Sequence, residues 1–203
     1  SPMIDEIVHD FIVPGEYFTI NRARQYGKTT TLELLYQRLR EKYVVIDLSF
    51  EGRDEYFASL ATFAGGLRLD MLDILSEQRP ALSDIFASPL DEAFPLRDLG
   101  KRITALSQKA NDRVVLTIDE VDKASDNAIL ITFLGLLRDK YIERVTSGTP
   151  TFHSVILAGV HDIKNLKMKL RPDEQHSYNS PWNIAARFDV DMSFSAPAIA
   201  TML

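Results

Sequence analysis

The sequence contains no cysteine among its 203 residues. This absence excludes disulfide bonds, thiolate metal sites and a cysteine nucleophile. The four histidines lack metal-ligand spacing, and no glycine-x-serine-x-glycine motif is present, so zinc sites and hydrolase triads are disfavoured. An excess of positive charge is also missing, because 23 Lys and Arg face 29 Asp and Glu, for a net charge of −6. A broad nucleic-acid surface is therefore disfavoured, although a local contact is still open.

Long apolar runs are lacking as well. The longest one, at 128–137, is about half the length that a membrane span needs, so we expect no membrane contact. The first residues have neither the basic start nor the apolar centre of a secretory signal, which predicts a cytoplasmic protein. Hydrophobic residues at 45% and charged residues at 26% are typical of a folded globular chain. The length predicts one domain over residues 1–203.

Apolar, β-branched runs alternate with stretches of helical periodicity along the chain. The runs predict strands at 17–20, 43–48, 113–118, 154–158 and 187–192, and the periodicity predicts helices at 4–12, 29–42, 96–109 and 126–143. This alternation predicts an α/β fold with three layers, in which helices cover both faces of a parallel sheet. Ligands of such sheets bind at the carboxyl ends of the strands.

The tripeptide Gly27-Lys28-Thr29 lies between the first predicted strand and the helix that follows it. A phosphate-binding loop needs inward-facing N–H groups, a lysine for the β- and γ-phosphates, and a hydroxyl for Mg²⁺ at the start of the helix. The strict motif has a further glycine five residues before Gly27, where Arg22 stands. An ordinary glycine turn with a helix cap is the alternative interpretation. Arg22 and Arg24 either contact phosphate or are solvated charges.

Two adjacent carboxylates, Asp119 and Glu120, directly follow the apolar run at 113–118. In a phosphoryl-transfer site one carboxylate helps to hold Mg²⁺ and a second polarises the attacking water. Asp119 suits the first role and Glu120 the second. A strand that ends in two solvated acids is the alternative for this pair alone, but the loop at Lys28 favours the functional interpretation.

The two motifs together resemble those of P-loop ATPases of the additional-strand catalytic-glutamate division. More closely, residues 17–30 resemble the bacterial AAA-like ATP-binding proteins related to STAND ATPases, in which an arginine-rich loop commonly replaces the first glycine. The segments 118–124, 152–166 and 179–188 also resemble that family. The resemblance implies a P-loop fold with the strand order 5-1-4-3-2, and ATP and Mg²⁺ as ligands.

The expected site residues follow from the motifs and from this resemblance. Lys28 would hold the β- and γ-phosphates, Thr29 and Asp119 the metal, and Glu120 the attacking water. The resemblance implies a sensor just past the fourth strand, where His161 and Asp162 are the candidates. The basic stretch at 164–171 and the segment after it supply two candidates for an arginine finger, which are Arg171 and Arg187, unless these are solvated. The remaining nucleotide-binding residues would be Arg24, Gln25, Tyr26, Gly27 and Thr30.

Residues 54–110 form a helical insertion, because 28 and 119 lie farther apart than one strand and one crossover helix require. Its aliphatic spacing predicts core, with a lid or a partner surface as alternatives. The lid and winged-helix region that follow the core in the family are expected to be missing from this chain. We expect Mg²⁺-dependent ATP hydrolysis that drives a conformational switch. The alternatives are a nucleotide-binding module with negligible hydrolysis that recruits a protein or a second copy, and a nucleic-acid-associated AAA ATPase.

Overall fold

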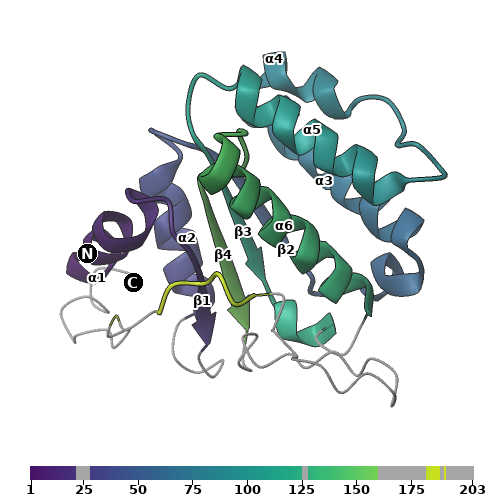
Figure 1. Cartoon of the computed structure of the whole chain (residues 1–203). Helices are drawn as coiled ribbons and strands as arrows, with labels where there is room; N and C mark the ends of the chain where they lie inside the picture. The colour runs from purple at the N-terminus through teal and green to yellow at the C-terminus, as the bar shows by residue number, and fades with distance from the viewer. Residues whose placement is uncertain (22–27, 125–127, 160–181, 188–189, 191–203) are drawn as a thin grey trace.

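The computed structural model describes residues 1–21, 28–124, 128–159, 182–187 and 190. Within these residues a four-stranded sheet forms, with the order β1-β4-β3-β2 and every neighbouring pair parallel (Figure 1). The prediction of an α/β fold with a parallel sheet is confirmed. The strands are β1 (Tyr17–Asn21), β2 (Val44–Ser49), β3 (Val114–Asp119) and β4 (Ser154–Gly159).

The helices match the periodic stretches of the sequence, with ends that shift by a few residues. One departure is that the first helix changes to π-helical geometry over Val8–Ile12, where the N–H of Val13 donates to the carbonyl of Val8. No helix among the described residues is both long and apolar enough to cross a membrane. The predicted strand at 187–192 falls largely outside the described residues. The helices are α1 (Pro2–Ile7), α2 (Lys28–Leu39), α3 (Leu60–Gln78), α4 (Pro80–Ser83), α5 (Pro95–Lys109) and α6 (Ala128–Ser147).

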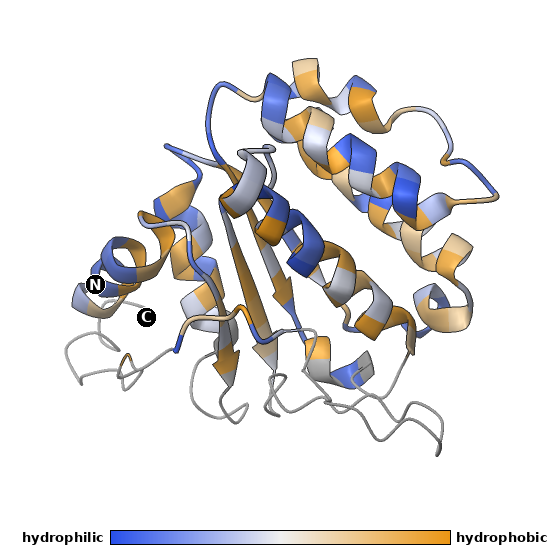
Figure 2. Ribbon diagram, viewed as in Figure 1, coloured by the Kyte–Doolittle hydropathy of each residue, from blue (hydrophilic) through white to orange (hydrophobic). Residues whose placement is uncertain are grey.

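Both faces of the sheet are covered by helices, which is compatible with the expected three layers. Along β2, Val44 and Ile46 pack into one core with α3, α5 and α6, whereas Val45 packs into a second core with α1 and α2. Alternate strand residues are thus buried on opposite faces, which explains why the strands read as continuous apolar runs. Figure 2 shows these apolar strands between helices whose polar residues lie mostly away from the sheet.

The insertion at 54–110 belongs to the core on one face of the sheet. Its helix α3 buries apolar residues four positions apart, and α5 buries apolar residues three or four positions apart. Ser59 caps the start of α3, because its hydroxyl accepts a hydrogen bond from the N–H of Thr62 at 3.0 Å. The predicted core role of the insertion is therefore confirmed for these stripes, which are Phe63, Leu67, Met71 and Leu75 on α3 and Leu99, Ile103 and Leu106 on α5.

Strand β2 lies at an edge of the described sheet, where unpaired backbone groups would invite another strand. The side chain of Gln78, the last residue of α3, lies against this edge. Its Nε2 donates to the carbonyl of Val45 at 2.8 Å, and its Oε1 accepts from the N–H of Val45 at 3.4 Å. One amide side chain therefore satisfies both backbone groups of a strand residue.

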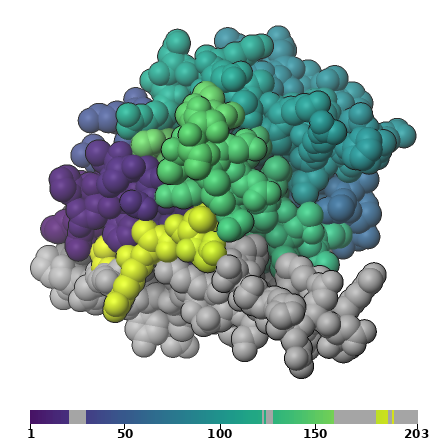
Figure 3. All heavy atoms as spheres, viewed as in Figure 1, coloured from purple at the N-terminus to yellow at the C-terminus, as the bar shows by residue number. Residues whose placement is uncertain are grey.

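Residues 182–187 lie beside β1, on the edge of this strand that does not pair with β4. Trp182 is fully buried and stacks on Tyr17, with ring centroids 5.9 Å apart. The N–H of Ala186 donates to the carbonyl of Tyr17 at 2.7 Å, and Ala186 forms a parallel bridge with Phe18. In Figure 3 this segment (yellow) lies on the surface between the N-terminal helix and α6. The late chain thus runs parallel to β1 where it is described.

Candidate functional site

The four strands end side by side at one edge of the sheet, the carboxyl edge. Ser49 of β2 pairs with Asp119 of β3, and Asn21 of β1 pairs with Gly159 of β4. Helix α2 begins at Lys28, seven positions after the last residue of β1. Since β1 runs toward the carboxyl edge, the helix starts at this edge and runs back along the sheet (Figure 1).

Asp119 lies on the face of the sheet that α2 covers. Helix α2 packs on β2 and β3, and Val115 of β3 belongs to the core on that side. Because side chains alternate along a strand, Thr117 and Asp119 share the face of Val115. The first turn of α2 and the carboxylate of Asp119 therefore occupy the same edge and the same face, as expected for the two sequence motifs.

The Asp119-Glu120 pair is largely buried, with 8% and 7% of the two residues exposed. The N–H of Glu120 donates to Oδ1 of Asp119 at 2.7 Å, and the N–H of Phe50 donates to the carbonyl of Asp119 at 3.1 Å. These bonds fix the backbone where β3 ends. Two carboxylates that are buried at a sheet edge are costly to desolvate, which distinguishes the pair from ordinary solvated acids at the end of a strand.

Glu120 has a φ of 57°, and it is the one residue other than glycine with positive φ in the described chain. Side chains with a Cβ rarely adopt this left-handed conformation, and it costs on the order of 1 kcal/mol or more. The turn rotates the chain directly after Asp119, so that a short 3₁₀ turn at Val121–Ala124 can start at once. Strained residues of this kind cluster at functional sites.

A lysine from that 3₁₀ turn connects Glu120 with the end of β2. The Nζ of Lys123 lies 3.9 Å from Oε2 of Glu120 and donates to Oε1 of Glu51 at 3.3 Å. Glu51 is well exposed and Lys123 about one-third exposed, so solvent weakens both contacts. The arrangement nevertheless places one cation beside the carboxylate of Glu120.

A second polar pair, Asp47 and Thr117, lies on the same face of the sheet as Asp119. The Oγ1 of Thr117 donates to Oδ1 of Asp47 across the neighbouring strands. Asp47 is exposed overall, but partial burial of its carboxyl group raises its pKa; the hydrogen bond from Thr117 opposes this shift, and the charges of Glu33 and Asp119 add to it. Asp47 was not among the residues expected from the sequence, although a charged residue inside an apolar run was a signal for it.

The structure brings together only part of the expected site. Thr30 is exposed in the first turn of α2, and the side chains of Lys28 and Thr29 lie outside the described part, although both residues belong to α2. Arg187 is exposed and follows the bridge at Ala186, so it lies beside the middle of β1, short of the carboxyl edge. The other expected residues lie outside the described residues, namely Arg22, Arg24, Gln25, Tyr26, Gly27, His161, Asp162 and Arg171.

A magnesium ion fits the chemistry of the residues that are described. Asp119 supplies the oxygen donor that Mg²⁺ prefers, at the edge where α2 begins. No group of three or more His, Asp or Glu among the described residues could hold a metal ion. A magnesium site built from one carboxylate, one hydroxyl, phosphate oxygens and water does not need such a group.

Two comparisons with known proteins add no family to this picture. Neither a protein-family model nor a curated protein matches the sequence. The functional interpretation therefore depends on the motifs and on the geometry of the carboxyl edge.

Proposed function

We propose that this chain is a Mg²⁺-dependent ATP-binding domain that hydrolyses ATP to ADP and phosphate and acts as a conformational switch, in the manner of AAA-like ATPases related to STAND proteins. The observation that carries the proposal is the convergence at the carboxyl edge. The start of α2 and the carboxylate of Asp119 share one edge and one face of the sheet, and Asp119 and Glu120 are both largely buried. The proposed fold includes a fifth strand beside β1, which the parallel bridge between Phe18 and Ala186 supports.

Each proposed role follows from residue chemistry and position. Lys28, at the start of α2, would neutralise the β- and γ-phosphates, which also benefit from the positive end of the helix. When bound by Thr29 and Asp119, Mg²⁺ would offset further phosphate charge. Glu120 would accept a hydrogen bond from the attacking water and orient it toward the γ-phosphorus. Its low exposure favours this role, because electrostatic contacts are stronger where water is excluded.

The first experiment is a calorimetric titration with a non-hydrolysable ATP analogue, with and without Mg²⁺. We expect saturable binding that Mg²⁺ strengthens, and loss of binding in Lys28→Ala. Lys42→Ala is the matched control, because Lys42 is an exposed lysine just beyond the other end of α2. Equal binding by the Lys28→Ala variant and the unmodified chain would refute the proposed site.

A second candidate function is a nucleotide-binding switch with negligible hydrolysis. The contact of Lys123 with Glu120 favours it, because a cation 3.9 Å from the carboxylate competes with water for that group. Single-turnover hydrolysis separates the two functions. Measurable turnover that disappears in Glu120→Gln supports the ATPase, whereas tight binding without turnover supports the switch. In the second case we expect Lys123→Met to increase the rate.

A further inference from the structure

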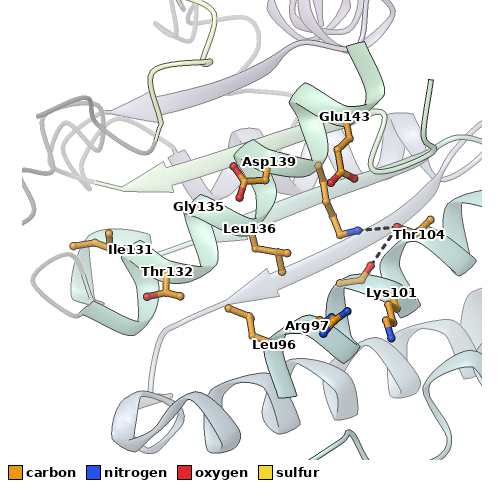
Figure 4. Close-up of a pocket in the computed structure, with 12 residues that line it drawn as sticks. Leu96, Arg97, Lys101, Thr104, Ile131, Thr132, Gly135, Leu136, Asp139 and Glu143 are labelled. Carbon is orange, nitrogen blue, oxygen red and sulfur yellow. Dashed lines mark hydrogen bonds between the residues drawn. The ribbon is translucent and has the colours of Figure 1, made fainter. Parts of the chain in front are cut away.

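A groove of about 840 Å³ runs between α5 and α6 (Figure 4). Its volume is in the range of about 300 to 1,000 Å³ that small-molecule sites occupy. Leu96 projects from α5, and Ile131 and Leu136 from α6, so that one stretch of the groove has apolar walls. Among the described residues, none that is proposed for ATP binding lines it.

Two glycines shape the groove. At Gly100 the helices approach closely, since an added Cβ would lie 3.1 Å from Cδ1 of Leu136 and 3.2 Å from Cε of Lys140. At Gly135 the reverse holds, because an added Cβ would meet no atom within 4 Å. Glycine weakens a helix interior by about 1 kcal/mol relative to alanine. Gly135 therefore lowers the stability of α6, although no close contact at this position requires a glycine.

The polar feature of the groove is Lys140. Only 8% of this residue is exposed, although an ammonium group is costly to bury. Its Nζ donates to Oγ1 of Thr104 at 2.7 Å, and this is the one acceptor within hydrogen-bond distance among the described residues. An ammonium has three N–H donors, so two of them are left for another group. Burial lowers the pKa of Lys140, while the charge of Glu143 raises it.

The charges around the groove favour a ligand with a single negative charge. Among the described lining residues, three are basic (Arg97, Lys101 and Lys140) and two are acidic (Asp139 and Glu143), which gives these residues a net charge of +1. A dianion would carry more negative charge than these residues neutralise, and a cation would be repelled by the ammonium of Lys140. A monoanion with an apolar body matches both the buried cation and the apolar walls.

We propose that the groove between α5 and α6 binds an amphipathic monocarboxylate, whose carboxylate accepts hydrogen bonds from Lys140 and whose aliphatic body lies along Leu96, Ile131 and Leu136. The ligand replaces the acceptors that the buried ammonium lacks in the described protein. Charge-assisted hydrogen bonds in a desolvated site contribute a factor of about 10 or more to affinity. This site is independent of the proposed ATP site.

The test is a calorimetric titration of the full chain with decanoate, below its micelle concentration, and with decylammonium as a probe of the same chain length and opposite charge. We expect saturable binding of decanoate alone. Lys140→Met keeps an unbranched side chain that is one atom shorter but removes the ammonium, and should weaken binding by about 10-fold or more. Lys109→Met is the matched control, because Lys109 is an exposed lysine on α5 that does not line the groove, and it should bind as the unmodified chain does.

A second variant tests the location of the ligand. Gly135→Leu fills the open space beside α6 and should abolish decanoate binding, with the folded state checked by circular dichroism. Methyl NMR shifts on addition of decanoate should concentrate at Leu96, Ile131 and Leu136. Equal affinity for decylammonium, unchanged affinity in Lys140→Met, shifts confined to other methyl groups, or no saturable binding of decanoate would each overturn the proposal.

Discussion

Replacing Glu120 by glycine and by alanine tests whether the turn after β3 is truly left-handed. At a φ of 57° a residue with a Cβ carries about 1 to 2 kcal/mol of steric cost, and glycine carries none. Glycine also gives the unfolded chain more freedom, which lowers stability by about 0.4 to 1 kcal/mol relative to alanine. We therefore expect Glu120→Gly to be more stable than Glu120→Ala by about 0.5 to 1 kcal/mol. Both variants lose the carboxylate, so its contacts cancel in this difference.

At position 135 the comparison of glycine with alanine should have the opposite result, with the alanine variant more stable. Gly135 lies inside α6 with open space around it, so nothing opposes the helix preference for alanine. We expect Gly135→Ala to increase stability by about 1 kcal/mol. This control separates the effect of the left-handed turn from any general effect of glycine on this chain.

Urea unfolding followed by circular dichroism at 25 °C measures both differences, and a change of 1 kcal/mol corresponds to about 2 to 4 °C in Tm for a protein of this size. An alanine variant at position 120 that equals or exceeds the glycine variant in stability would refute the reasoning. The same proteins serve the functional test, because neither should hydrolyse ATP if Glu120 orients the attacking water.

Two further predictions concern stability. Burial and the nearby charge of Arg113 lower the pKa of His153. The folded state therefore binds a proton on this side chain less readily than the unfolded state does. The free energy of unfolding should fall as the pH drops below about 6.5. A His153→Gln variant should lack this decline, and an unchanged pH profile would contradict the assignment. Arg102 donates to the carbonyls of Ser88 and Pro89, so Arg102→Met should lower stability by about 2 kcal/mol in urea unfolding. Arg102→Lys should recover little of it, because lysine lacks the planar fork.

The sequence was most informative where local pattern and burial agree. Strands β3 and β4 are buried on both faces, so their apolar runs needed no tertiary information to be recognised. Helix α5 begins at Pro95 and α3 begins after Ser59, residues typical of helix starts. The π-helical turn at Val8–Ile12 was not predicted, because its apolar spacing does not differ from that of an ordinary helix.

The candidate site was predictable only in its residue types. A strand ending in Asp119 and Glu120 was visible in the sequence, but the left-handed turn at Glu120 and its contact with Lys123 were not. Asp47 was missed because its partner, Thr117, lies 70 positions away and meets it only when β2 and β3 pair in register. The edge contact of Gln78 with Val45 was equally hidden, since it joins the end of a helix to a distant strand.

The sequence by itself determined the class of the fold, because alternating apolar runs and amphipathic stretches have few ways to bury their apolar faces other than a parallel sheet covered by helices. It also fixed which residue types follow the strands. Only the tertiary structure decided that Asp119 shares a face with the start of α2, which of the alternatives for residues 54–110 holds for the buried stripes of α3 and α5, and that Lys140 is buried beside an open groove. These features depend on contacts between segments far apart in the chain, which local preferences do not encode.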